Sequence, residues 1–269
     1  MRYRPSDLAA NRGYSPEGVE ALAYSLGDET PPDMFEAFNI GREVAPPGVP
    51  PDVIASYYAP NLWPVEPEEM RETWLEYWVA LEQLGLVLTD IFARALGLPS
   101  GWFRPLLDRS ISVLRANNYQ RRGTAEPVQP GQLRMGAHSD YTTYTLLLAD
   151  PVPGLQIVGA DGGWVDVVPQ PGNLPMNVGD LLAMWTNDTW PSTLHRVVPM
   201  ALGAADRRRS VAWFHYPDPD VVVAPLPAFA GDAPRYEPVR VDDHVRGKLG
   251  APKTGEAPTS ASTAADRPV

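Results

Sequence analysis

The stretch Met135-Gly136-Ala137-His138-Ser139-Asp140-Tyr141 is the one on which the predicted fold and site depend. On a β-strand, side chains two residues apart point to the same face, so His138 and Asp140 can converge on one point. A second histidine from another strand would complete two imidazoles and one carboxylate on one face of a metal ion. Such a set leaves coordination positions open and suits a non-haem Fe(II) ion. Taken alone, however, a His-x-Asp pair is more often a chance pair in a loop.

A second stretch, Ser192-Thr193-Leu194-His195-Arg196-Val197-Val198, offers that histidine. His195 follows Asp140 by 55 residues, far enough for several strands to intervene. Thirteen residues later, Arg208 and Ser210 open a run that alternates like a strand. On one strand face they would present a guanidinium fork and a hydroxyl to a carboxylate.

A third stretch lies upstream, at Leu114-Arg115-Ala116-Asn117-Asn118-Tyr119. Asn117 and Tyr119 would share one face of another strand. Asn118 offers a competing register on the opposite face, so the sequence leaves two choices open here.

The order Arg-x-Asn-x-Tyr, His-x-Asp, His and Arg-x-Ser resembles the isopenicillin N synthase-like family of Fe(II)/2-oxoglutarate oxygenases. The resemblance extends from about Gly13 to about Val223, and it includes Trp185-Thr186-Asn187 and Phe214-His215-Tyr216-Pro217-Asp218. It implies a mainly β fold with flanking helices, in which a double-stranded β-helix (jelly roll) is packed by a long helix. It also implies Fe(2+), 2-oxoglutarate as co-substrate, and O2.

The resemblance also implies roles for seven residues. The metal ligands, which are the catalytic residues, would be His138, Asp140 and His195. The far carboxylate of 2-oxoglutarate would pair with Arg208 and Ser210, while Asn117 and Tyr119 would reach toward the same co-substrate.

Three function classes follow from this resemblance. The first is a 2-oxoglutarate-dependent dioxygenase that hydroxylates a small molecule, such as a specialised metabolite or an antibiotic-pathway intermediate, with release of succinate and CO2. The second is an oxidative cyclase of the same family that does not use 2-oxoglutarate, in which Arg208 and Ser210 bind a substrate carboxylate. The third is an inactive relative with a truncated N-terminus.

Composition sets limits on the partners. The 22 Lys and Arg residues against 33 Asp and Glu residues give a net charge of −11, with a pI of about 4.8. This balance argues against nucleic acid or an anionic membrane as partner, because both are bound by basic patches. The chain has no cysteine, which excludes disulfides, thiolate catalysis and iron–sulfur clusters. We therefore expect a cytoplasmic protein that acts on a small-molecule substrate as a monomer or weak homo-oligomer.

The resemblance, together with the sequence pattern, implies a division of the chain into five segments. We expect residues 1–66 to be the remnant of an N-terminal oxygenase domain, shortened by several dozen residues relative to the family. The other segments are supporting helices at 67–110, the catalytic jelly-roll core at 111–225, a C-terminal extension at 226–246 and a disordered tail at 247–269.

Periodicity predicts the individual elements. Helical spacing predicts a helix from about Pro16 to Leu26, a short turn of helix at Met34–Phe38 and a long helix at Pro67–Leu96. A shorter helix through Leu106 is expected, with Ser100 as its N-cap. The polar segment from Gln120 to Gln132 is a candidate lid. Nine strands are expected, near 112–119, 134–137, 145–148, 155–158, 164–168, 174–177, 182–186, 195–199 and 210–216.

Overall fold

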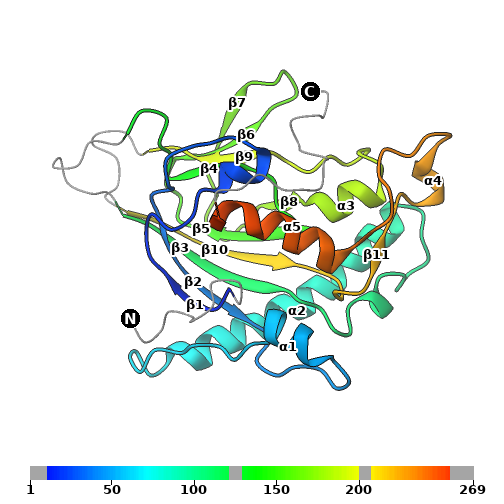
Figure 1. The fold of residues 1–269 in the computed structure, drawn as a ribbon, viewed down its shortest axis with the longest axis horizontal. Coiled ribbons are helices and arrows are strands. Elements are labelled where there is room, and N and C mark those ends of the chain that lie inside the picture. The colour runs from blue at the N-terminus through cyan, green and yellow to red at the C-terminus, as the bar shows by residue number, and fades with distance from the viewer. Residues whose placement is uncertain (1–10, 121–128, 200–206, 255–269) are drawn as a thin grey trace.

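The computed structural model describes residues 11–120, 129–199 and 207–254. Two antiparallel sheets form a jelly roll (Figure 1). The larger sheet has the strand order β1 (Gly13–Ser15), β2 (Glu36–Gly41), β3 (Val113–Gln120), β10 (Arg207–His215), β5 (Tyr144–Ala149) and β8 (Met176–Val178). The smaller sheet has the order β4 (Met135–His138), β9 (His195–Val197), β6 (Leu155–Val158) and β7 (Trp164–Val167). Eight of the nine expected strands are thus present, and the predicted jelly roll is confirmed.

The helix α2 (Met70–Ala95) covers the outer face of the larger sheet and confirms the predicted long helix (Figure 1). Its apolar stripe packs on side chains that point outward from β5 and β10. Gly85 lets the helix approach closely, because a Cβ there would lie 2.6 Å from the Trp213 ring. The Tyr144 hydroxyl donates to the Gly85 carbonyl at 3.3 Å, and the ring of Phe92 lies 5.2 Å from that of Tyr144. The outer face of the sheet is therefore a close-packed structural core.

The N-terminal segment differs from its prediction in three places. Between Pro16 and Leu26 only the 3-10 helix η2 (Leu22–Leu26) forms. The expected turn of helix at Met34–Phe38 is wrong, because β2 runs through it and pairs with β3. A short helix that was not predicted, α1 (Pro51–Tyr57), begins with proline at its first position. At Met34–Phe38, pairing with the neighbouring strand β3 outweighed the local helix propensity.

Two further elements were predicted wrongly. The helix expected from Ser100 to Leu106 is reduced to the 3-10 turn η3 (Arg104–Leu106), and the Ser100 hydroxyl donates to Asp90 instead of capping a helix. The strand expected at 182–186 is the helix α3 (Asp180–Trp185), all of whose residues are buried. Periodicity cannot distinguish a fully buried strand from a fully buried helix of this length.

The C-terminal part contains α4 (Pro227–Ala230), the two-stranded sheet of β11 (Val222–Val223) and β12 (Val239–Arg240), and the helix α5 (Val241–Thr254). A disordered tail was expected from Gly247, but α5 continues to Thr254, so this expectation was wrong for residues 247–254. The remainder of the tail, 255–269, lies outside the described residues. The centre of the candidate lid, 121–128, does so as well.

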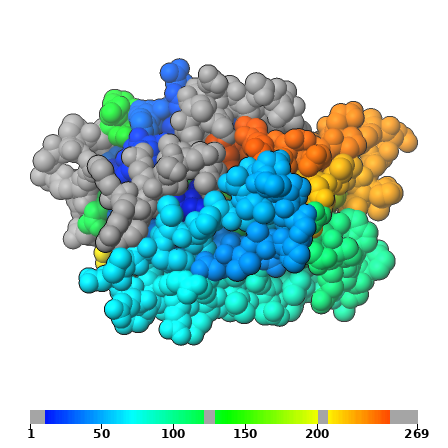
Figure 2. Space-filling model, turned by 60° about the horizontal axis from the view of Figure 1, so that its bottom comes forward, coloured from blue at the N-terminus to red at the C-terminus, as the bar shows by residue number. Residues whose placement is uncertain are grey.

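Helices α1 and α5 meet on the face that Figure 2 shows. The Tyr57 hydroxyl donates to Asp242 at 2.6 Å, and Arg246 donates to the Ser56 hydroxyl at 2.9 Å. Two segments far apart in the sequence are thereby joined at one edge of the jelly roll. Among the helices of the described residues, none is both long and apolar enough to cross a lipid bilayer.

Candidate active site

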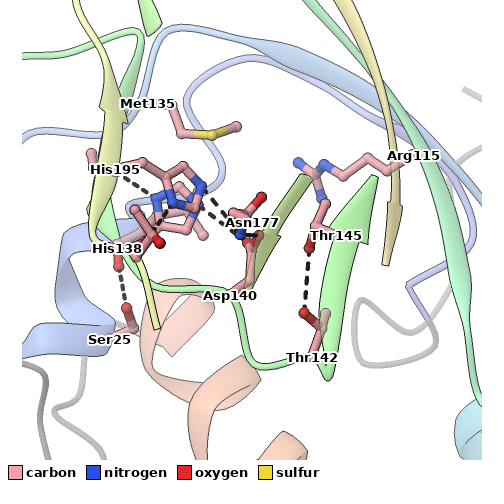
Figure 3. Close-up of polar contacts among 12 residues, drawn as sticks. Ser25, Arg115, Met135, His138, Asp140, Thr142, Thr145, Asn177 and His195 are labelled. Carbon is pink, nitrogen blue, oxygen red and sulfur yellow. Dashed lines mark hydrogen bonds and ion pairs between the residues drawn. The ribbon is translucent and has the colours of Figure 1, made fainter. Parts of the chain in front are cut away.

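The two histidines of the predicted metal site are cross-strand neighbours, because β4 pairs with β9 and places His138 opposite His195. Asp140 lies two residues beyond His138, where β4 has already ended. The convergence therefore comes from the turn after the strand and not from strand alternation, which corrects the expectation of a shared strand face. Asp140 Oδ1 lies 3.9 Å from Nε2 of His138 and 3.8 Å from Nε2 of His195 (Figure 3).

Backbone carbonyls orient both imidazoles. Nδ1 of His138 lies 2.8 Å from the Gly136 carbonyl oxygen, and Nδ1 of His195 lies 2.9 Å from that of Thr193. Because a carbonyl only accepts, each Nδ1 carries the proton, and each Nε2 keeps a lone pair for a metal. The ligand atoms of the two histidines and the aspartate all lie within 4.8 Å of one another.

Electrostatics keep His138 in the form that a metal requires. Burial lowers the pKa of His138 to about 4, the nearby His195 adds to this effect, and Asp140 opposes it. A neutral imidazole at neutral pH binds a metal without first losing a proton. Two nitrogens and one carboxylate oxygen on one side of a point, in a buried site, fit a ferrous ion with open positions.

A cavity of about 300 Å³ between the two sheets opens onto this triad. Apolar side chains of both sheets line the cavity, among them Leu147, Leu155 and Ile157. Arg208 also lines the cavity; it is only 1% exposed, and its Nε and Nη2 have no hydrogen-bond partner among the described residues. A buried guanidinium without a partner is costly unless an anion completes it. The residues present therefore fit the carboxylate of a bound acid.

The register of β3 against β10 brings the other predicted co-substrate residues to Arg208. Arg208 is opposite Tyr119, and Ser210 is opposite Asn117. All four side chains are buried and line the same cavity. Asn118 points to the other face of the sheet, where its amide donates to Glu36 at 2.7 Å. The structure thus distinguishes the two registers that the sequence left open.

Two charged residues that line the cavity, Arg115 and Glu20, were given no role in the site from the sequence. Arg115 makes a buried ion pair with Glu20, with Nη2 at 3.0 and 3.1 Å from the two carboxylate oxygens. Arg115 Nε also donates to Asn117 Oδ1 at 2.8 Å. Strand alternation could have found Arg115, which lies two residues before Asn117. No local periodicity places Glu20 in the cavity.

Asp33, also missed, ties the N-terminal segment to the metal-site strand. Its carboxylate accepts from the backbone N–H of Leu22 at 2.9 Å and from that of Gly136 at 2.8 Å. Burial raises the pKa of Asp33 to about 7, with the two backbone donors acting against the rise. The strand that carries His138 is thereby anchored to η2.

Two histidines and an aspartate converge in one cavity of a jelly roll, and the same cavity contains a buried arginine. This combination defines a class, the non-haem iron oxygenases that use a 2-oxo acid. The family profile described as the 2OG-Fe(II) oxygenase superfamily matches residues 111–217. Relatives more than 30% identical support the match, and the chain belongs to the 2-oxoglutarate–Fe(II) oxygenase superfamily. Enzymes of this family use Fe(2+), 2-oxoglutarate and O2, as the resemblance implied.

Three comparisons illustrate this membership. The chain is 33% identical over 252 residues to the 2-oxoglutarate-Fe(II) type oxidoreductase hxnY of Emericella nidulans, covering 88% of this chain and 67% of the relative. It is 31% identical over 216 residues to validamycin A dioxygenase of Streptomyces hygroscopicus, covering 80% of this chain and only 59% of the relative. The crystal structure of a full-length Neurospora crassa protein in complex with alpha-KG and thymine superposes with a TM-score of 0.78 at 30% identity, covering 93% of this chain and 77% of that one.

Proposed function

We propose that this chain is a dioxygenase that oxidises a small molecule, in the simplest case by hydroxylation, and converts 2-oxoglutarate to succinate and CO2. His138, Asp140 and His195 would hold the ferrous ion, which supplies the oxidising chemistry when bound. The chain's own residues would bind and orient the two organic molecules and exclude water.

The buried guanidinium of Arg208 carries this proposal. A planar fork of donors grips a carboxylate with two parallel hydrogen bonds, and it does so most strongly where water is excluded. Ser210 and Tyr119 add hydroxyl groups beside it. A dicarboxylic 2-oxo acid could thus place its far carboxylate on Arg208 and its oxo-acid end at the triad.

The rest of the cavity would be left for the main substrate. Its wall is mixed, with the rings of Tyr141 and Tyr216 and the ion pair of Arg115 with Glu20. A specialised metabolite or antibiotic-pathway intermediate is our proposal for the substrate class. The name of one relative, validamycin A dioxygenase, supports it. Action in the cytoplasm as a monomer or weak homo-oligomer, without nucleic acid or membrane, remains part of the proposal.

The same arginine could instead bind a carboxylate of the main substrate, as in the oxidative-cyclase alternative. The balance of the reaction separates the two. The purified full-length chain, supplied with Fe(II), 2-oxoglutarate and air, should release succinate, and the correct member of a panel of candidate metabolites should accelerate that release. Substrate oxidation without succinate would establish the cyclase. Tight iron binding with no decarboxylation under any condition would establish an inactive relative, and either result would reject the proposal.

A further inference from the structure

The two oxygens of the Asp140 carboxylate have different surroundings. Oδ1 faces Nε2 of both histidines, at 3.9 and 3.8 Å. Oδ2 accepts a hydrogen bond from Nδ2 of Asn177 at 2.7 Å (Figure 3). Only one oxygen is therefore turned toward the point on which the two imidazoles converge.

The segment that carries Asn177 is itself held in place. Asn177 lies opposite Thr145 in the pairing of β8 with β5. Three residues later, the backbone N–H of Asp180 donates to the backbone carbonyl of Asp140 at 2.8 Å. At Gly179 the chain passes so near the turn between Asp140 and β5 that a Cβ would lie 2.2 Å from the Thr142 carbonyl oxygen. The segment 177–180 thus donates hydrogen bonds both to the side chain and to the backbone carbonyl of Asp140.

We propose that Asn177 is a positioning residue that restricts Asp140 to coordination through Oδ1 alone. A carboxylate can bind a metal through one oxygen or through both. If Oδ2 also bound, it would occupy a position that the oxo acid and oxygen need. The hydrogen bond from Asn177 engages Oδ2 and fixes the plane of the carboxylate, so that Oδ1 alone would be presented to a bound metal. This inference rests on the proposed metal site.

The chemical nature of the donor agrees with this role. An amide donates a hydrogen bond without adding a charge, whereas lysine or arginine at the same place would oppose the binding of a divalent cation. Partners of this kind, which hydrogen-bond to metal ligands, contribute about 10- to 100-fold to metal affinity.

The test uses the full chain loaded with Co(II), whose visible absorption reports coordination number and geometry. Asn177→Leu keeps the approximate size and removes the donor. We expect the Co(II) dissociation constant to rise by about 10- to 100-fold and the absorption spectrum to change. Asn118→Leu is the matched control, because it removes an amide–carboxylate hydrogen bond of the same 2.7 Å length on the far face of the sheet. It should leave both readings unchanged.

A second variant, Asn177→Gln, retains the amide but moves it by one methylene, and it serves if the leucine variant does not fold. It should show a spectral change and an intermediate affinity. Variants that melt earlier yet bind Co(II) with the wild-type affinity and spectrum would show a structural role only, and would overturn the inference. If the wild-type chain itself bound no Co(II), the proposed function would fail and this inference with it.

Discussion

Arg208 lies directly opposite Tyr119 in the antiparallel pair of β10 with β3, and its guanidinium carbon lies 5.3 Å from the centre of the Tyr119 ring. Two residues along, Ser210 lies opposite Asn117. Because side chains alternate along a strand, both pairs share the inner face of the sheet. Two strands thus present four polar groups at one end of a cavity whose neighbouring walls are apolar.

Removing either histidine of the triad should abolish metal binding. With His138→Ala or His195→Ala, two ligands remain, too few to hold a labile ferrous ion. We expect loss of stoichiometric Fe(II) or Co(II) binding and of activity, while circular dichroism shows an intact fold. Full activity in wild-type protein stripped of iron by chelators would contradict this expectation.

A third histidine provides the control for that experiment. His215 points away from the cavity and stacks on Tyr144 with ring centres 4.5 Å apart, and burial lowers its pKa to about 3. Since its Nδ1 has no hydrogen-bond partner within the described part of the chain, His215→Phe should preserve the stacking and the stability. Its metal affinity should equal that of the wild type.

The sequence predicted the triad because His-x-Asp and a later histidine are spaced as such sites require. It did not predict why Asp140 faces the histidines, since that depends on the turn after β4 and on Asn177, 37 residues away. Likewise, every residue of the run Asp180–Trp185 is buried, so its sequence shows no polar face by which a helix could be distinguished from a strand. Contacts of this kind are fixed by tertiary packing, which local periodicity does not encode.

The register of β3 can be tested with a pair of neighbouring asparagines. Asn117 faces the cavity, whereas Asn118 faces away. Asn117→Ala should raise the half-saturating concentration of 2-oxoglutarate by about 5- to 30-fold, which corresponds to the loss of about 1–2 kcal/mol from one buried hydrogen bond. Asn118→Ala should leave this concentration unchanged. A larger effect from Asn118→Ala in titrations of both variants would show that the opposite register applies.

The close approach at Gly179 should be indispensable for the metal site. Gly179→Ala would place a methyl group 2.2 Å from the Thr142 carbonyl oxygen, and the backbone must shift to relieve this contact. We expect destabilisation by about 1–3 kcal/mol together with weaker Co(II) binding, because the same segment holds Asp140. Gly85→Ala makes a similar clash with Trp213, far from the triad. It should lower the melting temperature and preserve Co(II) affinity; weaker binding in that variant would point to a general effect of instability.

Asp33 should make the stability of the metal-free protein depend on pH. Burial raises its pKa in the folded protein to about 7, from an ordinary value of 3.8, so the folded state holds the proton more tightly than the unfolded state. Its contribution to stability is then complete below about pH 4 and is lost as the pH rises through about 7. Denaturant titrations from pH 4 to 8 should show wild type losing stability relative to Asp33→Asn. A difference that stays constant or grows with pH would contradict this.

Arg208 is the residue on which the proposed function depends most, because it is expected to bind the far carboxylate of 2-oxoglutarate. Arg208→Gln and Arg209→Gln provide a matched pair, because Arg209 points outward to an exposed ion pair with Asp150 at 3.1 Å. The most direct measurement is the dissociation constant of 2-oxoglutarate for each metal-loaded variant. Arg208→Gln should raise it by about 10- to 1,000-fold, as expected from a loss of roughly 2–4 kcal/mol, while Arg209→Gln leaves it within about twofold. Wild-type affinity in Arg208→Gln would contradict the account.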